Sequence, residues 1–305
     1  MHFRIGIDVG GTNVRFGVFD ELSLCQEIRI NADFSILCQQ YPSAEAQEKI
    51  VTMLAEQVTK IQKQYLNIAS IGIGFPGFVD PISQKVLMSP NLPGLKDVDL
   101  NLALFALTGV PVKTENDALV AAYGEYHLLK ATNPTISNLI YLGLGTGVGG
   151  GLILNGKPYS GVNGVAMEIG HLIIVPQGRL CGCGNMGCME RYASASGISA
   201  TYYQACGVEK SAAAIAEMAA QGDRNAVEAY QIAGQSLAFA LAHILKIVDV
   251  RDVVIGGGVS AGWQWLQEPF TTQLNQMLIP VLKNKINIQI SSAGDIAGML
   301  GASML

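Results

Sequence analysis

The chain has 305 residues and a net charge of −5 at pH 7, and half of its residues are hydrophobic. Because lysine and arginine are scattered singly, this charge pattern excludes the classes that bind nucleic acid or an anionic membrane surface. The length suits two domains, and the start lacks the basic and apolar segments of a signal peptide. The lack of a signal peptide, together with a cluster of three cysteines spaced like metal ligands, favours a reducing, cytoplasmic location.

The first predicted elements form a β-hairpin with a glycine turn. Phe3 to Val9 and Val14 to Phe19 are apolar runs typical of strands, and a tight turn joins them. Consecutive N–H groups in such a turn bind phosphate oxygens, and Asp8, at the end of the first strand, could hold Mg²⁺ through water. A glycine hairpin without a ligand is the alternative. The turn residues are Gly10, Gly11, Thr12 and Asn13.

The middle of the first half alternates helix and strand and ends on a carboxylate. A helix is predicted over about 43–65, followed by a strand over 68–75, the turn Phe75-Pro76-Gly77 and a loop with SPNLPG at 89–94. Asp99 is expected to cap a short helix, and a strand over 110–114 leads into Glu115-Asn116-Asp117 and another helix. Asp117 therefore lies at a strand-to-helix junction, where it could react with a ligand or simply cap the helix.

A second glycine hairpin repeats the first. Residues 140–154, shifted by 134 positions, align Gly145 with Gly11, Thr146 with Thr12 and Val148 with Val14, between apolar strands. Two such hairpins predict a duplicated α/β architecture that grips one nucleotide from both sides of a cleft. The G-x-G-x-x-G that begins at Gly145 is a weak dinucleotide signature, because a strand follows it instead of a helix.

The segment from Glu168 to Glu190 is the most reactive part of the sequence. Its cysteines are spaced C-x-C-x4-C among glycines, and His171 is the only nearby histidine, which predicts a four-ligand zinc site. Incidental cysteines in a glycine-rich turn, or a disulfide with a spare thiol, are the alternatives. If helical, Glu168 and His171 share a face, so the metal would also fix carboxylates suited to sugar hydroxyls, unless both carboxylates are solvated surface charges. The predicted zinc ligands are His171, Cys181, Cys183 and Cys188.

The rest of the chain is predominantly helical. Helices are predicted over 191–206, 211–220, 223–248 and about 265–282, with strands over 252–255 and 286–290 and a final helix from about 295. Gly256, Gly257 and Gly258 follow a buried strand and allow either a close ligand or a plain turn. We expect domains at 1–114 and 115–294, a hinge near 113–116, and the helix at 295–305 packing on the first domain.

The motifs DVGGTNVRFGVF, FPGFVDP, SPN, END, LGTGVGGG, EIGH, CGCGNMGCME and IGGGVS together resemble the ROK family of sugar kinases, repressors and related proteins. The resemblance covers nearly the whole chain in the family's order. It implies the two-domain, actin-like ATPase fold (ribonuclease H-like) with a central cleft, and transfer of the γ-phosphate of ATP to a hexose. It also implies that the protein is a homodimer or homotetramer, as relatives often are.

Carried over to this sequence, the resemblance implies a role for each motif. Asp117 would be the general base. The sugar ligands would be Gly77, Asn91, Asn116, Asp117, Glu168, His171 and Glu190. The phosphates would lie on Gly10, Gly11, Thr12 and Asn13 and on Gly145, Thr146 and Gly147, with adenosine near Gly256, Gly257 and Gly258. Many relatives carry lysine where this chain has Asn13, so Mg²⁺, other residues or N–H groups must meet part of the phosphate charge.

Other hexose substrates and two other classes of function are alternatives to a glucokinase. SPNLPGLKDVDL followed by ENDA resembles glucokinase-type members, and fructose, mannose, allose or an N-acetylhexosamine are the other candidate substrates. A sugar-sensing repressor is disfavoured, since such relatives carry a winged helix-turn-helix before the hairpin, which here starts at residue 3. A non-catalytic sugar-binding protein would not need Asp117 or both phosphate hairpins.

Overall fold

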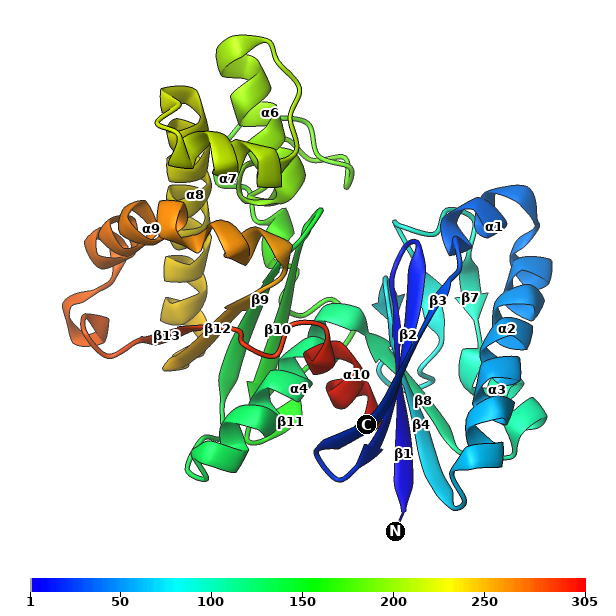
Figure 1. Ribbon diagram of the computed structural model, residues 1–305. Coiled ribbons are helices and arrows are strands. Elements are labelled where there is room, and N and C mark those ends of the chain that lie inside the picture. The colour runs from blue at the N-terminus through cyan, green and yellow to red at the C-terminus, as the bar shows by residue number, and fades with distance from the viewer. Residues whose placement is uncertain (1) are drawn as a thin grey trace. The chain divides into compact units, whose positions relative to one another are not determined.

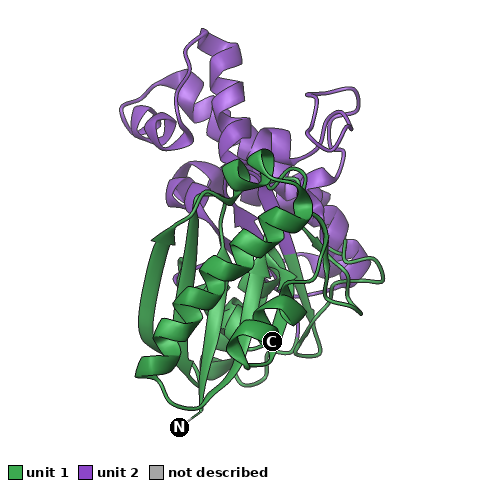
Figure 2. Cartoon of the chain, turned by 90° about the vertical axis from the view of Figure 1, so that its right-hand side faces the viewer, with its two compact units in different colours: residues 1–137, 151–166, 293–305 green, residues 138–150, 167–292 purple. Residues whose placement is uncertain are grey.

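The computed structural model describes residues 2–305, which divide into two compact units (Figure 2). Unit 1 holds the described residues up to Ser137 together with 151–166 and 293–305, and unit 2 holds 138–150 and 167–292. The helix that follows the predicted hinge belongs to unit 1 by its contacts, whereas the predicted boundary at 114/115 assigns it to the second domain. The predicted domain boundary stays a prediction.

Unit 1 contains the N-terminal sheet, its covering helices and the last helix of the chain. Its strands are β1 (Phe3–Val9), β2 (Asn13–Asp20), β3 (Ser23–Asn31), β4 (Ile68–Phe75), β5 (Phe78–Val79), β6 (Val86–Met88), β7 (Lys96–Val98), β8 (Val112–Asn116) and β11 (Lys157–Pro158). Its helices are α1 (Phe34–Gln40), α2 (Ser43–Gln64), α3 (Leu100–Thr108), α4 (Asp117–Thr132) and α10 (Ile296–Ser303).

The main sheet of unit 1 has the order β3-β2-β1-β4-β8, in which β1, β4 and β8 run parallel. Figure 1 shows α2 and α3 on one face of this sheet and α4 and α10 on the other. Alternating side chains explain both faces, because Ile5 and Ile7 of β1 join the core with α2, whereas Gly6 and Asp8 face α10. Gly6 has no room for a side chain beside Met299, so α10 packs directly on the sheet.

The second main sheet repeats the order of the first. It runs β11-β10-β9-β12-β13, and β9, β12 and β13 are parallel in the positions that β1, β4 and β8 occupy. The two glycine hairpins therefore stand in corresponding places, which confirms the predicted duplication. The remaining strands of this sheet are β9 (Leu139–Leu144), β10 (Val148–Leu154), β12 (Asp252–Gly256) and β13 (Asn287–Ile290).

Unit 2 carries the remaining helices. These are α5 (Glu190–Ala193), α6 (Ala195–Cys206), α7 (Ala212–Ala220), α8 (Arg224–Val248) and α9 (Trp263–Met277), with short 3₁₀ helices η1 (Ile169–His171), η2 (Gly258–Gly262) and η3 (Pro280–Leu282). Helix α8 is long and apolar enough to cross a bilayer by length and composition alone, but 56% of its most apolar window is buried. It packs against α6, α7 and α9, as a core helix does.

Three features differ from the sequence expectation. The predicted helix over 191–206 is interrupted at Ser194, whose φ of −79° and ψ of 170° are those of an extended residue. His171 lies in a short 3₁₀ helix that Glu168 precedes, so the α-helix on which the shared face was conditional does not form. Strand β3, helix α1 and the short strands β5, β6, β7 and β11 were not predicted. Strand β3 carries a weak pattern because it is an edge strand whose side chains alternate between half-buried and exposed.

Candidate functional site

The carboxyl ends of the parallel strands in unit 1 bring several predicted residues to one edge. Asp8 of β1 pairs in register with Gly74 of β4, which in turn pairs with Glu115 of β8. Asn116 and Asp117 follow directly on β8 and α4. Two strand spacings of about 4.8 Å each separate β1 from β8, so the first glycine turn and Asp117 lie roughly 10 Å apart along this edge.

Asn116, and not Asp117, caps helix α4. The Asn116 Oδ1 accepts the N–H of Leu119 at 3.0 Å, and its Nδ2 donates to the carbonyl of Gly77 at 3.0 Å. The alternative that Asp117 is only a helix cap is therefore wrong. Asp117 is the first helical residue, and its Oδ1 accepts the N–H of Ala118 at 2.8 Å. Carboxylates are favoured in this first turn because the helix dipole is positive there.

Gly77 and Asn91 lie on adjacent turns beyond β4. Gly77 has a φ of +142° and no space for a side chain beside Met88 and Ser89, so glycine is required here. Ser89 is buried and anchors the next turn, because its hydroxyl donates to Pro76 and accepts the N–H of Leu92. Asn91, between these two anchors, is exposed. A fixed turn therefore holds the backbone of Asn91, whose predicted role as a sugar ligand stays a prediction.

Asp8 lies in a charged cluster that the sequence did not reveal in full. Its carboxylate is 3.6 Å from Arg15, its register partner on β2, and Arg15 also binds Asp295 at 2.6 Å. Arg29 binds Asp295 at 3.1 Å from the other side. Burial, with a smaller contribution from Asp295, raises the pKa of Asp8 to about 6, although Arg15 lowers it. A bound cation would stabilise the ionised form of Asp8.

The first glycine turn is compact and open on its outer side. The Gly10 N–H donates to the Asn13 carbonyl at 2.9 Å, so it serves the hairpin itself. Gly11 has no positive φ, and no described atom lies within 4 Å of the position that a Cβ would take. Neither backbone conformation nor packing therefore requires glycine at position 11. The close approach of a ligand would require it.

The second glycine turn is held by the residues that follow the cysteine segment. The Glu190 Oε2 accepts the N–H of Val148 at 2.9 Å and fills the space beside Gly147. The Ala195 N–H donates to the carbonyl of Gly145 at 2.9 Å. Glu190, predicted as a sugar ligand, thus also lies against the predicted phosphate turn. The role of this neighbourhood was missed because spacing alone does not connect residues 145 and 195.

The three glycines of the third segment, Gly256 to Gly258, lie in three different environments. Gly256 packs against Tyr141, and Gly257 has a φ of +84° with no room for a side chain beside Leu144. Gly258 has no described atom within 4 Å of a Cβ and no positive φ. Structure alone therefore accounts for the first two glycines, whereas neither packing nor backbone conformation requires glycine at position 258.

The four predicted metal ligands come together in unit 2. The ligand atoms of His171, Cys181, Cys183 and Cys188 all lie within 4.8 Å of one another. The Cys181 Sγ is 3.6 Å from His171 Nδ1, and the Cys183 and Cys188 sulfurs are 3.6 Å apart and unbridged. Zinc with bonds of about 2.3 Å to sulfur places its ligands roughly 3.8 Å apart, so this donor set fits a tetrahedral ion.

The pKa values of two thiols in this cluster also suit the binding of a metal cation. Burial, with neighbouring thiols, raises the pKa of Cys188 to about 12, whereas a hydrogen bond from the Asn185 backbone lowers that of Cys183. A metal ion would supply the positive charge that keeps the buried thiol ionised. Gly187 has a φ of +85° and a Cβ there would strike the Val175 carbonyl, so the tight loop depends on this glycine.

His171 faces the cysteines with one ring nitrogen and a carboxylate with the other. Its Nδ1 lies towards Cys181, and its Nε2 is 3.8 Å from Glu168 Oε2. A carboxylate on the second nitrogen is the arrangement that orients metal-binding histidines. Burial raises the pKa of Glu168, His171 lowers it, and the nearby Glu190 raises it. Fixing His171 on a metal would therefore also fix the Glu168 carboxylate.

Arg179 ties the cysteine loop to the helices behind it. Its Nη1 donates to the carbonyls of Arg191 at 2.8 Å and Gly197 at 3.2 Å, and its guanidinium stacks over Tyr192. No sequence pattern singled out this arginine. The signal that could have found it is an arginine inside a loop with few other charges, since isolated guanidinium groups commonly bind carbonyls or aromatic rings.

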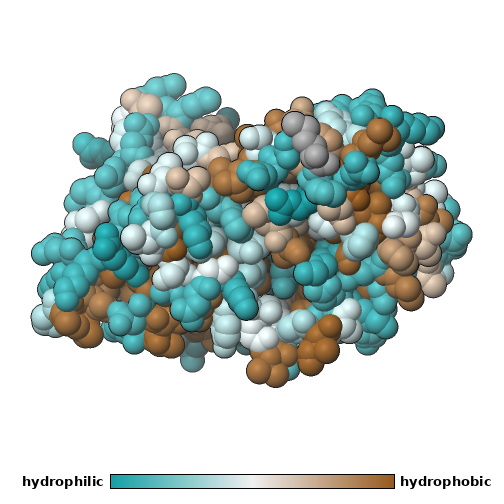
Figure 3. All heavy atoms as spheres, turned by 90° about the horizontal axis from the view of Figure 1, so that it is seen from below, coloured by the Kyte–Doolittle hydropathy of each residue, from teal (hydrophilic) through white to brown (hydrophobic). Residues whose placement is uncertain are grey.

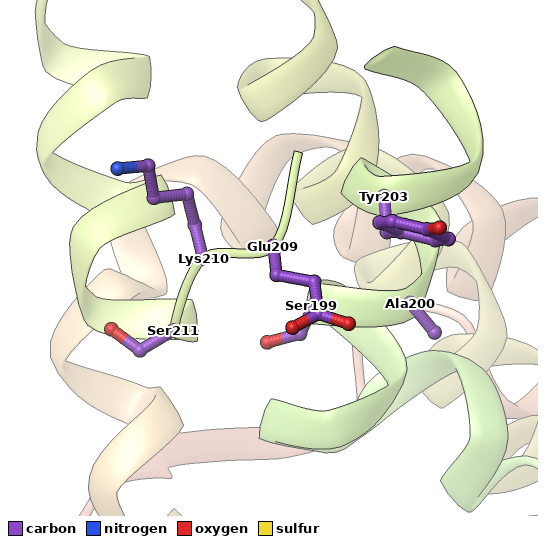
Figure 4. Close-up of a pocket in the computed structure, with 6 residues that line it drawn as sticks. All are labelled: Ser199, Ala200, Tyr203, Glu209, Lys210 and Ser211. Atoms are coloured by element: carbon purple, nitrogen blue, oxygen red, sulfur yellow. The ribbon is translucent and has the colours of Figure 1, made fainter. Parts of the chain in front are cut away.

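Unit 2 also has a cavity that contains none of the predicted site residues. It has a volume of about 520 Å³ and lies between α6 and the start of α7 (Figure 4). Its lining residues are Ser199, Ala200, Tyr203, Glu209, Lys210 and Ser211.

On the face shown in Figure 3, hydrophilic and hydrophobic residues are interspersed, in keeping with the scattered charges of the sequence.

Comparison with known proteins identifies the family. The glucokinase of Halalkalibacterium halodurans is 30% identical over 319 residues, covering 99% of this chain and 94% of that protein. The N-acetyl-D-glucosamine kinase of Vibrio parahaemolyticus is 33% identical over 312 residues, covering 98% of both chains. A crystal structure of a ROK family glucokinase from Streptomyces griseus, in complex with glucose and AMPPNP, is 30% identical with a TM-score of 0.79, covering 99% of this chain and 98% of that one.

These likenesses extend to the architecture. The duplicated sheets are those of the actin-like ATPase fold, which confirms the predicted fold class. The sequence profile described as the ROK family matches residues 4–305, which includes both glycine hairpins and the cysteine cluster. The chain therefore belongs to the ROK family.

Proposed function

We propose that this protein is a sugar kinase that transfers the γ-phosphate of ATP to a hexose, with glucose as its substrate and glucose 6-phosphate as its product. The observation that carries the proposal is the edge of the first sheet, where Asp117 follows β8 and the first glycine turn follows β1. A base and a phosphate-binding turn roughly 10 Å apart leave room for a hydroxyl and the phosphoryl group between them. The likeness to glucokinases supports the proposal.

In this proposal unit 1 holds the base, three of the sugar ligands and the first phosphate turn. Asp117 accepts the proton of the attacking hydroxyl, and Asn116, Gly77 and Asn91 bind the sugar. The transition state of phosphoryl transfer is loose, so positioning and electrostatics supply most of the catalysis. Asp8 would hold Mg²⁺ through water, and the ion would neutralise charge on the phosphates.

Unit 2 holds two further carboxylates and the second glycine turn. Glu168, His171 and Glu190 are proposed to accept hydrogen bonds from, or donate them to, the sugar hydroxyls. Thr146 and Gly147 are proposed to bind phosphate, with Gly258 beside the adenosine. Zinc held by the His171 and cysteine cluster would have four protein ligands and so would stabilise the loop and take no part in catalysis. Reduced thiols in this cluster favour the cytoplasm.

The test of the proposed function is ADP release in a coupled assay with a panel of hexoses. We expect glucose to give the highest kcat/KM among glucose, mannose, fructose, allose, N-acetylglucosamine and N-acetylmannosamine. N-acetyl-D-glucosamine is the second candidate, because the Vibrio parahaemolyticus relative is as similar as the glucokinases. Absence of ADP release with every sugar would contradict the proposed activity.

Gly11→Ala is expected to weaken ATP binding without lowering the stability of the fold. The new methyl group meets no described protein atom and needs no strained backbone, so the melting temperature should stay unchanged. A phosphate approaching the turn would meet that methyl group, so the KM for ATP should rise about tenfold, a cost near 1.4 kcal/mol. Steady-state kinetics should show an unchanged KM for the sugar. An unchanged KM for ATP would remove Gly11 from the nucleotide site.

Asp8→Asn is expected to make the fold more stable and to weaken the binding of Mg²⁺–ATP. A folded pKa near 6 means that protonation of Asp8 stabilises the fold below pH 3.8, and that this contribution is lost as pH rises through 6. Asparagine resembles the protonated form, so the variant should gain about 1–3 kcal/mol at pH 8. Arg15 keeps Asp295 as its partner.

Calorimetric melting of Asp8→Asn and the wild type at pH 8 and at pH 4.5 measures this gain. The difference in melting temperature should shrink at the lower pH, where Asp8 itself is protonated. The KM for Mg²⁺–ATP should rise at pH 8, since the carboxylate is lost. A variant less stable than the wild type at pH 8 would show that Asp8 is held mainly by its ion pair with Arg15.

A further inference from the structure

The second glycine turn is held from behind by the start of helix α6. The Ala195 N–H donates to the carbonyl of Gly145 at 2.9 Å, and the Ser196 hydroxyl donates to the carbonyl of Thr146 at 3.1 Å. Two consecutive carbonyls of the turn are thus fixed by two consecutive residues of one helix. All four residues lie in unit 2.

The break between α5 and α6 places Ser196 where it can reach the turn. Ser194 is extended, caps α6 by accepting the Gly197 N–H at 3.0 Å, and donates to the Glu190 carbonyl. The Ser194 and Ser196 hydroxyls are 2.9 Å apart. Because each hydroxyl has one proton, the Ser194 proton goes to the Glu190 carbonyl and the Ser196 proton to the Thr146 carbonyl. A continuous helix over 191–206 would lack this arrangement.

Anchored carbonyls determine where the N–H groups of the turn point. In a planar trans peptide the C=O and N–H point in opposite directions, so tying the Gly145 carbonyl to α6 directs the Thr146 N–H away from that helix. The Ser196 bond to the Thr146 carbonyl directs the Gly147 N–H in the same way. Gly145 has only one described atom, 4.0 Å away, near a Cβ position, so a ligand can approach the turn there.

We propose that Ser196 is a positioning residue for the phosphate donor, whose hydroxyl holds the Thr146 carbonyl so that the Gly147 N–H is presented to the triphosphate. This inference rests on the proposed function, because it names a residue that supports the ATP site. The turn is fixed on its other side by Glu190, which accepts the Val148 N–H at 2.9 Å. Without Ser196 the peptide between Thr146 and Gly147 can rotate away from the orientation that binds phosphate.

The experiment compares Ser196→Ala with Ser196→Thr and with Ser43→Ala as a matched control. The Ser43 hydroxyl also donates to a backbone carbonyl, that of Lys96 at 3.2 Å, but it lies on the surface of unit 1. We expect Ser196→Ala to raise the KM for ATP and the Kd for AMPPNP about 3- to 10-fold, as the loss of one hydrogen bond does. Threonine retains the hydroxyl and should restore most of the affinity, and Ser43→Ala should match the wild type.

The KM for the hexose distinguishes a role in ATP binding from a general structural role, because a general structural defect would change both KM values. The KM for the hexose and the melting temperature of Ser196→Ala should stay within twofold and about 1 °C of the wild type. Equal increases in both KM values, or no change in AMPPNP affinity, would overturn the inference. If the wild type binds AMPPNP but phosphorylates no hexose, the proposed function fails, whereas the AMPPNP affinities of the three variants still support or overturn the role of Ser196.

Discussion

Asp117→Asn should lower kcat by about 10²- to 10⁴-fold and leave the dissociation constant for the sugar within a few-fold of the wild type. The amide keeps an oxygen where Asp117 Oδ1 accepts the Ala118 N–H at 2.8 Å, so the start of α4 stays intact. The substitution removes the ability to take a proton, together with the negative charge that the helix dipole favours. Helix α4 keeps its cap, because Asn116 and not Asp117 bonds to Leu119.

Two measurements separate the role of Asp117 as a base from a role in binding. Coupled ADP release gives kcat, and titration calorimetry with glucose gives affinity in the absence of turnover. Asp99→Asn is the matched control, because Asp99 begins α3 in the same unit and its Oδ1 also bonds to a backbone N–H, that of Leu102 at 2.9 Å. That control should turn over normally. A near-normal kcat in Asp117→Asn would assign the proton transfer to another group.

Cys183→Ser should prevent binding of the proposed zinc ion and weaken the proposed sugar site. Cys183 is exposed, so serine creates no buried cavity and the change acts through the loss of one thiolate ligand. Without the proposed ion the His171 ring would be held less firmly, and the Glu168 carboxylate, 3.8 Å from its Nε2, would lose support. Loss of such support typically costs about 10- to 100-fold in affinity or activity, so we expect the KM for the hexose to rise by at least tenfold.

The metal is measured directly as well as through activity. Elemental analysis should find about one zinc per chain in the wild type and in the control Cys25→Ser, whose exposed cysteine lies on β3 of the other unit. Cys183→Ser should contain little metal and should melt at a lower temperature. Metal-free protein with unchanged affinity for sugar would contradict the supporting role of the cluster, and wild-type metal content in Cys183→Ser would contradict the ligand set.

Much of the local structure could be predicted from the sequence because it depends on neighbouring residues. Strand β4 and helix α2 follow from apolar runs and from spacing, and the cap at Asp99 from residue type. Errors arose where tertiary contacts outweigh propensity. Ser194 breaks a helix that its neighbours would continue, since the carbonyls of Gly145 and Thr146 take the Ala195 N–H and the Ser196 hydroxyl.

By itself the sequence determined the pair of glycine hairpins, the grouping of His171 with three cysteines and the strand that leads into Asp117, because these depend on residue type and short spacing. Only the tertiary structure decided that Asp295 stands beside Asp8, that Arg179 ties the cysteine loop to α5 and α6, and that Ser196 supports Thr146. Asp8 and Asp295 are nearly the whole chain apart in sequence. The packing of α10 on the first sheet brings them together, and no local pattern encodes which distant helix will cover a given strand.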